Sequence, residues 1–213
     1  MIVPDFGTAD EDVIASWLKG ALNGLVPVDS LLDAASDKRM KADLRTGCWF
    51  LVVDYVSNPS GNSDVYVKNL VWLATILKTP GCVQYLRHFV ECRKSFEALP
   101  VSQRNHVLYA IYDSSVPVDA SFWALVALAY GDHHKNIAIS GLLRHGIEAA
   151  VWLMPRLPND QDMANNLYDS LDQYYTRTKD PKMSGYLSEW CKKCAPFVRE
   201  SIEKIMSEVS NAS

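Results

Sequence analysis

Apolar residues recur every three or four positions along most of the chain, which is the spacing of an amphipathic helix. The first such segment runs from residue 9 to residue 24, where Gly24 can close the helix. From residue 44 to residue 56 apolar residues surround the axis, and we expect a helix because no nearby segment offers a partner strand. Asp64 is positioned to cap the next helix. The apolar stripe of that helix is formed by Tyr66, Leu70, Leu73 and Leu77.

The middle of the chain predicts two longer helices with a buried helix between them. Residues 81 to 99 form an amphipathic pattern that places Cys92 on the apolar side. Residues 135 to 154 form the second long pattern, which Pro155 stops. Residues 122 to 130 carry no charge on any face, so this helix should be central and buried.

The last third of the chain has two further apolar stripes. Asn159 or Asp160 can cap the first of these helices. Its buried side should hold Met163, Leu167, Leu171 and Tyr174. The final stripe is formed by Met183, Leu187, Trp190, Cys194, Val198, Ile202, Ile205 and Val209. This stripe keeps its phase across Pro196, as a kinked helix or two abutting helices would.

Two segments share the sequence Val-Pro-Val-Asp, at residues 26–29 and 116–119. Pro and Asp both favour a helix start, so Asp29 and Asp119 are expected at the beginning of helices. No fixed repeat period accompanies the two copies, which disfavours a regular solenoid. We expect an all-α fold of about nine or ten helices joined by short turns. These helices should form a compact irregular bundle or stacked helical hairpins, in a single domain over residues 1–213.

Composition and charge limit the functional classes. Of the 213 residues, 48% are hydrophobic and 22% are charged, which allows a full core and argues against disorder. The formal net charge of −4 disfavours general nucleic-acid binding, which usually needs a basic surface. No apolar run approaches the roughly 18 residues of a membrane span, and the N-terminus lacks a signal-peptide pattern. The five cysteines form no disulfide framework, so we expect a soluble, cytoplasmic protein.

Two cysteine-containing motifs could carry metal or redox chemistry. Cys191 and Cys194 are three residues apart, but they lie inside a helical pattern with Cys194 on the apolar stripe, which favours packing. His88 and Cys92 are four residues apart on one predicted helix and could share a metal ion, although two ligands alone do not make a site. The chain has no glycine-rich phosphate loop, and we expect no cofactor.

Adjacent histidines are the more interesting candidate for a metal or acid–base site. His133 and His134 follow Asp132 in a turn after the most apolar helix, where they could bind a metal ion or transfer protons. They lack a paired spacing such as His-Glu-x-x-His, and a solvated turn with one capping histidine is the alternative. Asp54 stands alone in an apolar run, as either a buried acid of raised pKa or a hydrogen-bonded residue at the core edge.

The helix after Pro158 carries an acidic stripe opposite its apolar side. Asp162, Asp169 and Asp172 follow one another at helical spacing, and Tyr168 and Tyr175 lie close to them. Acidic side chains speed association with a basic partner, and tyrosine is enriched in protein interfaces. We therefore predict that these five residues bind a protein partner, although an ordinary solvated face has the same composition.

The absence of a catalytic motif favours binding over catalysis. We expect a non-catalytic helical protein that binds a protein partner, in the manner of an adaptor, an inhibitor or an immunity-type protein. One alternative is a helical enzyme with a dispersed and metal-dependent site that includes His133, His134 and Asp54. Another is a self-assembling structural protein, a homo-oligomer formed through the C-terminal helix.

Overall fold

A computed structural model describes residues 4, 9–26, 30–31, 33, 40–114 and 116–211. These residues form twelve α-helices and two short 3-10 helices and contain no strand, which confirms the predicted all-α class. The helices are more numerous than predicted, in part because two of the predicted long helices are each divided. The predicted helix start at Asp29 lies outside the described residues. No helix in the described parts of the chain has both the length and the apolar character needed to cross a bilayer.

The chain divides into two compact units, Met1–Pro117 and Val118–Ser213, and each is described by itself. The first unit contains α1 (Glu11–Leu22), α3 (Met40–Ser57), α4 (Asp64–Ile76), α5 (Pro80–Glu91), α6 (Arg93–Glu97) and α7 (Val101–Asp113). The second contains α8 (Ala120–Ala129), η1 (Asp132–His134), α9 (Lys135–Leu143), α10 (Ile147–Ala150), η2 (Met154–Arg156), α11 (Gln161–Thr178), α12 (Met183–Cys191) and α13 (Pro196–Asn211). The predicted single domain stays a prediction, since two such units can form one domain or two.

The helix ends of the first unit follow local rules of capping. Gly24 adopts φ +79°, and the amide of Leu25 donates to the Gly20 carbonyl at 3.0 Å, so Gly24 closes α1 as predicted. Ser63 caps α4, because its hydroxyl accepts from the Tyr66 amide at 3.1 Å. The predicted cap, Asp64, is instead the first residue of α4.

The helix predicted over residues 81 to 99 is interrupted at Cys92. The backbone of Cys92 lies at φ −78° and ψ 70°, outside the helical region, and separates α5 from α6. The Cys92 side chain is therefore exposed, and its predicted place on the apolar side is wrong. The turn brings the rings of Phe89 and Phe96 edge to face with centroids 5.8 Å apart, so the apolar contact continues across the break.

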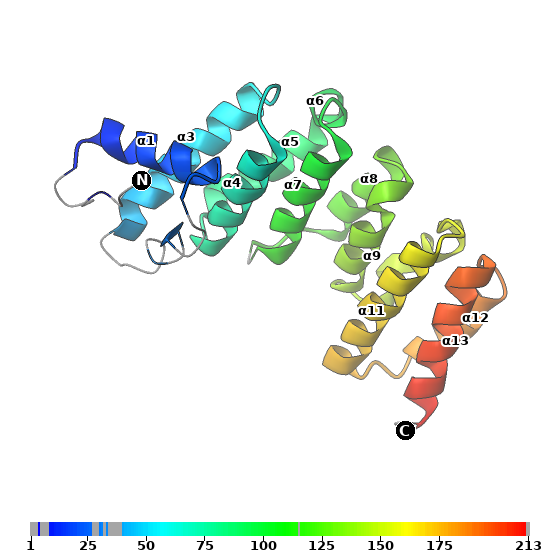
Figure 1. The fold of residues 1–213 in the computed structure, drawn as a ribbon. Coiled ribbons are helices and arrows are strands. Elements are labelled where there is room, and N and C mark those ends of the chain that lie inside the picture. Colours follow the sequence, from blue (N-terminus) through cyan, green and yellow to red (C-terminus); the bar gives the residue numbers. More distant parts are fainter. Residues whose placement is uncertain are drawn as a thin grey trace. The chain divides into compact units, whose positions relative to one another are not determined.

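In the first unit, α3 and α5 pack side by side and run in the same direction (Figure 1). The rings of Trp49 and Tyr85 lie 5.6 Å apart, and one to two turns further along, Tyr55 and Phe89 lie 6.0 Å apart. Because later residues of α3 meet later residues of α5, the two helices are parallel.

The partner helices α4 and α7 repeat this arrangement. Near the start of both helices, the Gln103 amide donates to the Asn62 carbonyl at 3.0 Å. Near their ends, the Thr75 hydroxyl donates to the Ala110 carbonyl at 3.4 Å. The hairpins α3–α4 and α5–α7 are thus stacked with like helices adjacent, which is the packing of helical-hairpin repeats and one of the two predicted arrangements.

In the second unit, α9, α11 and α13 form a layer of neighbouring helices (Figure 1). Ser140 of α9 and Ser170 of α11 have hydroxyl oxygens 2.7 Å apart, and the Arg177 guanidinium donates to the Leu143 carbonyl at 3.4 Å. The sequence order of these contacts shows that α9 and α11 are parallel. The α11 helix contacts α13 on its other side, so it is the central helix of the layer.

The prediction of one long helix over residues 135 to 154 is wrong. It ends at Leu143, and Gly146 follows at φ +112°, a conformation that a side chain would strain. A short α10 and a 3-10 turn complete the segment. The glycine thus breaks the helical path although the apolar pattern continues through it.

The predicted burial of α8 is correct for only one of its faces. Phe122, Trp123 and Val126 are buried, whereas Leu128 is 72% exposed and Leu125 is 37% exposed. By contrast, all eight residues of the final apolar stripe are buried. Seven of them belong to the two abutting helices α12 and α13, and Cys194 lies in the short connection between these helices.

A glycine is required where α8 and α9 cross. A Cβ atom added to Gly141 would overlap the indole ring of Trp123, which is buried. Gly141→Ala should therefore destabilise the second unit by about 1–3 kcal/mol through overpacking. Gly185→Ala in α12 is the matched control, since a Cβ there meets nothing, and it should stabilise by about 0.5–1 kcal/mol. Denaturant unfolding followed by circular dichroism tests both, and equal stabilities of the two variants would contradict the crossing described.

Candidate functional site

The α11 helix presents its predicted acidic stripe on the side away from the core. Asp160 caps the helix by accepting from the Met163 amide at 2.9 Å, as one of the two predicted caps. The buried side consists of Met163, Ala164, Leu167, Leu171 and Tyr174 and so includes every predicted core residue of this helix. Asp162 and Asp169 are exposed and Asp172 is half-buried. We call these three aspartates the acidic face.

The carboxylates of the acidic face have no basic counterpart on their own helix face. Sequence positions 157 to 176 contain no Lys or Arg. None of the three aspartates forms an ion pair with any residue that the structure describes. Asp169 and Asp172 are three residues apart, where like charges destabilise a helix by about 0.2–0.5 kcal/mol.

Tyr168 joins the acidic face to α13. Its hydroxyl donates to both carboxylate oxygens of Glu208, at 2.8 and 2.9 Å. The Lys204 ammonium lies 3.9 Å from the centroid of the Tyr168 ring, within cation–π distance. The hydrogen bond to Glu208 is the main cause that raises the pKa of Tyr168 to about 12, and Asp172 and Asp169 add to it. Tyr168 is thus a half-buried side chain already engaged by the neighbouring helix.

Tyr175 is also half-buried and lies beneath a lysine. The Lys179 ammonium is 4.5 Å from the centroid of its ring. Lys179 is the residue that ends α11, at φ 49°. A partner that contacted the Tyr175 ring face would have to displace this lysine, so the predicted role of the ring stays a prediction.

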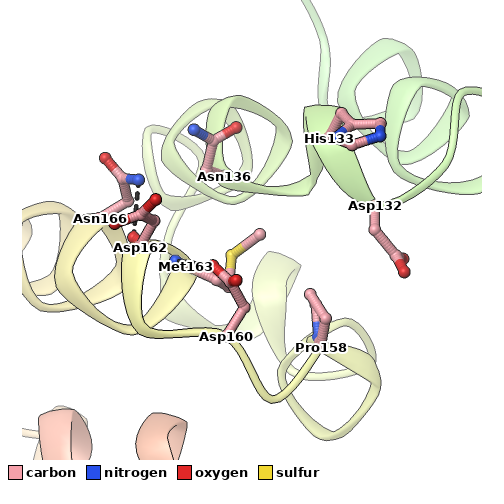
Figure 2. Close-up of a pocket in the computed structure, with 8 residues that line it drawn as sticks. All are labelled: Asp132, His133, Asn136, Pro158, Asp160, Asp162, Met163 and Asn166. Atoms are coloured by element: carbon pink, nitrogen blue, oxygen red, sulfur yellow. Dashed lines mark hydrogen bonds between the residues drawn. The ribbon is translucent and has the colours of Figure 1, made fainter.

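A cavity of about 330 Å³ opens where α11 begins (Figure 2). Its lining comes from the turn η1 and the start of α9 on one side, and from the loop before α11 and its first turns on the other. The lining residues are Asp132, His133, Asn136, Pro158, Asp160, Asp162, Met163 and Asn166. The cavity therefore brings together His133, predicted as part of a metal or acid–base site, and Asp162, predicted as part of a partner-binding face.

Two of the three cavity carboxylates already have partners. Asp132 pairs with the Lys135 ammonium at 2.6 Å, and Asp160 caps α11. Asp162 forms no ion pair with any described side chain, and His133 is exposed. The lining is therefore polar, and it has one acidic side chain available to a cationic group.

The adjacent histidines diverge and do not form a common pair of metal ligands. His134 is fully buried, with its ring against Tyr130 at a centroid separation of 6.5 Å, whereas His133 is exposed on the cavity wall. Among the described residues, no group of three or more His, Cys, Asp or Glu side chains is placed to hold a metal ion.

The other polar candidates lie apart from this cavity. Asp54 belongs to α3 of the first unit and is exposed, so it is neither a buried acid nor tucked into the core. His88 is exposed, with its Nδ1 3.6 Å from the Glu91 carboxylate. The Cys92 side chain is also exposed, and neither residue belongs to a group of described side chains placed to hold a metal ion.

The cysteines of the CxxC motif pack against different neighbours. The Cys191 thiol donates to the Met206 sulfur at 3.9 Å, and the Cys194 thiol donates to the Met154 carbonyl at 3.8 Å. Burial raises the pKa of Cys191 and raises that of Cys194 to about 11. Both side chains are therefore thiols at neutral pH, which agrees with a packing role and not with a redox CxxC.

Comparisons with protein-family models, with curated proteins and with solved structures find no match for this chain. The site therefore has to be argued from its own residues. Sequence reasoning missed Glu208 and Lys204, which contact Tyr168 from α13. Their spacing of four on one amphipathic helix marks a shared face, but nothing in the sequence indicates that this face meets Tyr168.

The contact between Tyr168 and Glu208 can be measured by titration. Glu208→Gln should lower the pKa of Tyr168 from about 12 toward its ordinary value of 10.0, because the carboxylate that disfavours the phenolate is removed. Carbon NMR of the Tyr168 ring across alkaline pH reports this pKa directly. Because the folded-state pKa is the higher one, the contact contributes stability at neutral pH and loses it as the pH rises through about 12.

Glu200→Gln serves as the control, since Glu200 is an exposed glutamate of the same helix. It should leave the Tyr168 titration unchanged. Equal Tyr168 pKa values in the Glu208→Gln variant and the parent protein would show that α11 and α13 do not pack in this register.

Proposed function

We propose that this protein is a non-catalytic binding protein whose acidic face engages a basic segment of another protein. The observation that carries the proposal is the set of unpaired carboxylates of Asp162, Asp169 and Asp172 on the outer side of α11. An adaptor, an inhibitor or an immunity-type protein has this mode of action, and a cytoplasmic partner is part of the proposal.

The energetics of α11 support a binding role for these charges. Repulsion between Asp169 and Asp172 destabilises α11 when no partner is bound, and neither side chain belongs to the buried side of the helix. A basic partner would replace this repulsion by attraction. Exposed ion pairs contribute about 0.2–1 kcal/mol each, so their larger effect is on the association rate and on the choice of partner.

The cavity beside Asp162 supplies the enclosed contact that an exposed charged face lacks. Its volume of about 330 Å³ and its lining of Asp162, His133, Asn136 and Asn166 suit a lysine or arginine side chain of the partner. An anchor enclosed in a cavity contributes more to affinity than charges at the rim of an interface. The proposed footprint therefore runs from the cavity along α11 toward Tyr168.

The layer of α9, α11 and α13 supports an elongated partner segment. Stacked helices present extended surfaces on which proteins of this architecture bind peptides and other proteins. The acidic face belongs to the central helix, so a bound segment could contact the helices on both sides. By contrast, the final apolar stripe is buried within the unit. A homo-oligomer formed through the C-terminal helix would therefore have to use the solvent-facing side of α13.

Neutralising the acidic face should weaken partner binding without loss of folding. The triple variant Asp162→Asn, Asp169→Asn, Asp172→Asn removes three charges, which corresponds to about a three- to 150-fold loss of affinity for a basic partner. The partner is captured from the native cell, purified, and titrated against each variant at two salt concentrations. Unfolding free energy should be unchanged or slightly higher, since the repulsion within α11 is gone.

The matched control is the triple variant Asp12→Asn, Asp54→Asn, Asp113→Asn, which makes the same charge change at exposed positions of the first unit. This control should bind as the parent protein does, and binding should weaken as salt rises. Retention of the same partners with equal affinity by the α11 variant would refute the proposal.

A further inference from the structure

Two buried cysteines from different helices meet in the first unit. Cys48 lies in the middle of α3 and Cys82 lies in the first turn of α5. Both side chains have no exposed surface, and the largest cause of the pKa shift of each thiol is the other thiol. No sequence motif indicates this pair, because the two residues are 34 positions apart.

The parallel register of α3 and α5 explains why the two thiols meet. Tyr55 and Phe89, whose rings are in contact, each follow one of the cysteines by seven positions. Gly81 precedes Cys82, and a Cβ atom there would lie 3.3 Å from the Trp49 ring. The absent side chain lets the helices approach closely at this level, and a disulfide requires such closeness, with Cα atoms within about 7 Å.

The two sulfur atoms have different surroundings. Cys82 is the third residue of α5, where the unpaired amides and the positive end of the helix dipole favour a thiolate. The hydrogen bond with Cys48 lowers the pKa of Cys82, and the Thr79 side chain adds to this effect. The same bond, together with burial, raises the pKa of Cys48. Cys82 is therefore the nucleophile of the pair and Cys48 is its proton donor.

We propose that Cys48 and Cys82 are a redox-active dithiol, which a peroxide converts into an intramolecular disulfide that joins α3 to α5. The Cys82 thiolate attacks one oxygen of hydrogen peroxide, the O–O bond breaks, and the leaving hydroxide takes a proton to become water. The Cys82 sulfenic acid is then attacked by the Cys48 sulfur. The S–S bond forms, the S–O bond breaks, and the proton of Cys48 leaves with the hydroxide as a second water. Two thiols thus lose two electrons and two protons, and one peroxide becomes two waters.

The other cysteines offer no equivalent pair. Cys92 is exposed, and Cys191 and Cys194 hydrogen-bond to separate neighbours. Because Cys48 and Cys82 are buried, their oxidation follows local opening of the helices and is slower than that of Cys92. The product is nevertheless favoured, because the parallel register of α3 and α5 already places the two cysteines at the same level of the closely packed helices.

The disulfide should stabilise the first unit. It would close the chain between residues 48 and 82 and so restrict the unfolded state. The expected result is an unfolding midpoint that rises by several degrees on oxidation and returns when the bond is reduced.

The test uses the full chain with Cys92→Ala and Cys191→Ala, which leaves three of the five thiols. After incubation with hydrogen peroxide, the protein is denatured and alkylated, and its thiols and peptides are identified by mass spectrometry. One alkylated thiol should remain, at Cys194, with a cross-link between the peptides that contain Cys48 and Cys82. The matched control adds Cys48→Ala, which should form no intramolecular cross-link while circular dichroism shows retained helix.

Several results would overturn the proposal. One is that Cys48 and Cys82 both remain alkylatable after an incubation with peroxide many times longer than the complete oxidation of Cys92 in the parent chain requires. Another is that Cys82 proceeds to sulfinic acid without a cross-link to Cys48. A cross-link that lowers the unfolding midpoint would also overturn it, because the bond would then have formed in a distorted structure.

Discussion

Lateral packing between parallel helices is the constraint on which both units depend. Each amphipathic helix can bury only one side of its surface, and it does so against helices that run beside it in the same direction, as α3 does with α5 and α9 with α11. Residues at corresponding positions of neighbouring helices therefore meet, as the rings of Trp49 and Tyr85 and the hydroxyls of Ser140 and Ser170 do. The outer sides of the helices are left with no structural task, and their composition is open to selection for other purposes.

The acidic face of α11 lies on such an outer side. The core contacts of α11 are complete without Asp162, Asp169 and Asp172, and their mutual repulsion opposes the helix that carries them. Tyr168 sits at the boundary between the two sides, where Glu208 and Lys204 of α13 hold it. The proposed partner would meet this surface on the outer side of α11.

Much of the fold could be predicted from the sequence, because burial and helical period leave a direct pattern. The buried side of α11 and the eight buried residues of the final apolar stripe were predicted correctly for this reason. The positions at which helices are interrupted were harder to predict. Cys92 breaks a helix with no glycine or proline, and Gly146 breaks one whose apolar pattern continues past it.

The candidate site was only partly predictable, since its parts come from distant segments. Asp162 and His133 were both identified, but only the placement of η1 and the start of α11 around one cavity shows that they belong to the same site. The opposite environments of His133 and His134 depend on one 3-10 turn. One further contact links the edge of the cavity to α13. Asn159 lies in the chain between the cavity residues Pro158 and Asp160, and its side chain accepts a hydrogen bond from the Phe197 amide, in the first turn of α13, at 3.1 Å. An occupant of the cavity would lie beside the residue that holds the start of α13, so the Phe197 amide is a position on another helix from which occupancy could be followed.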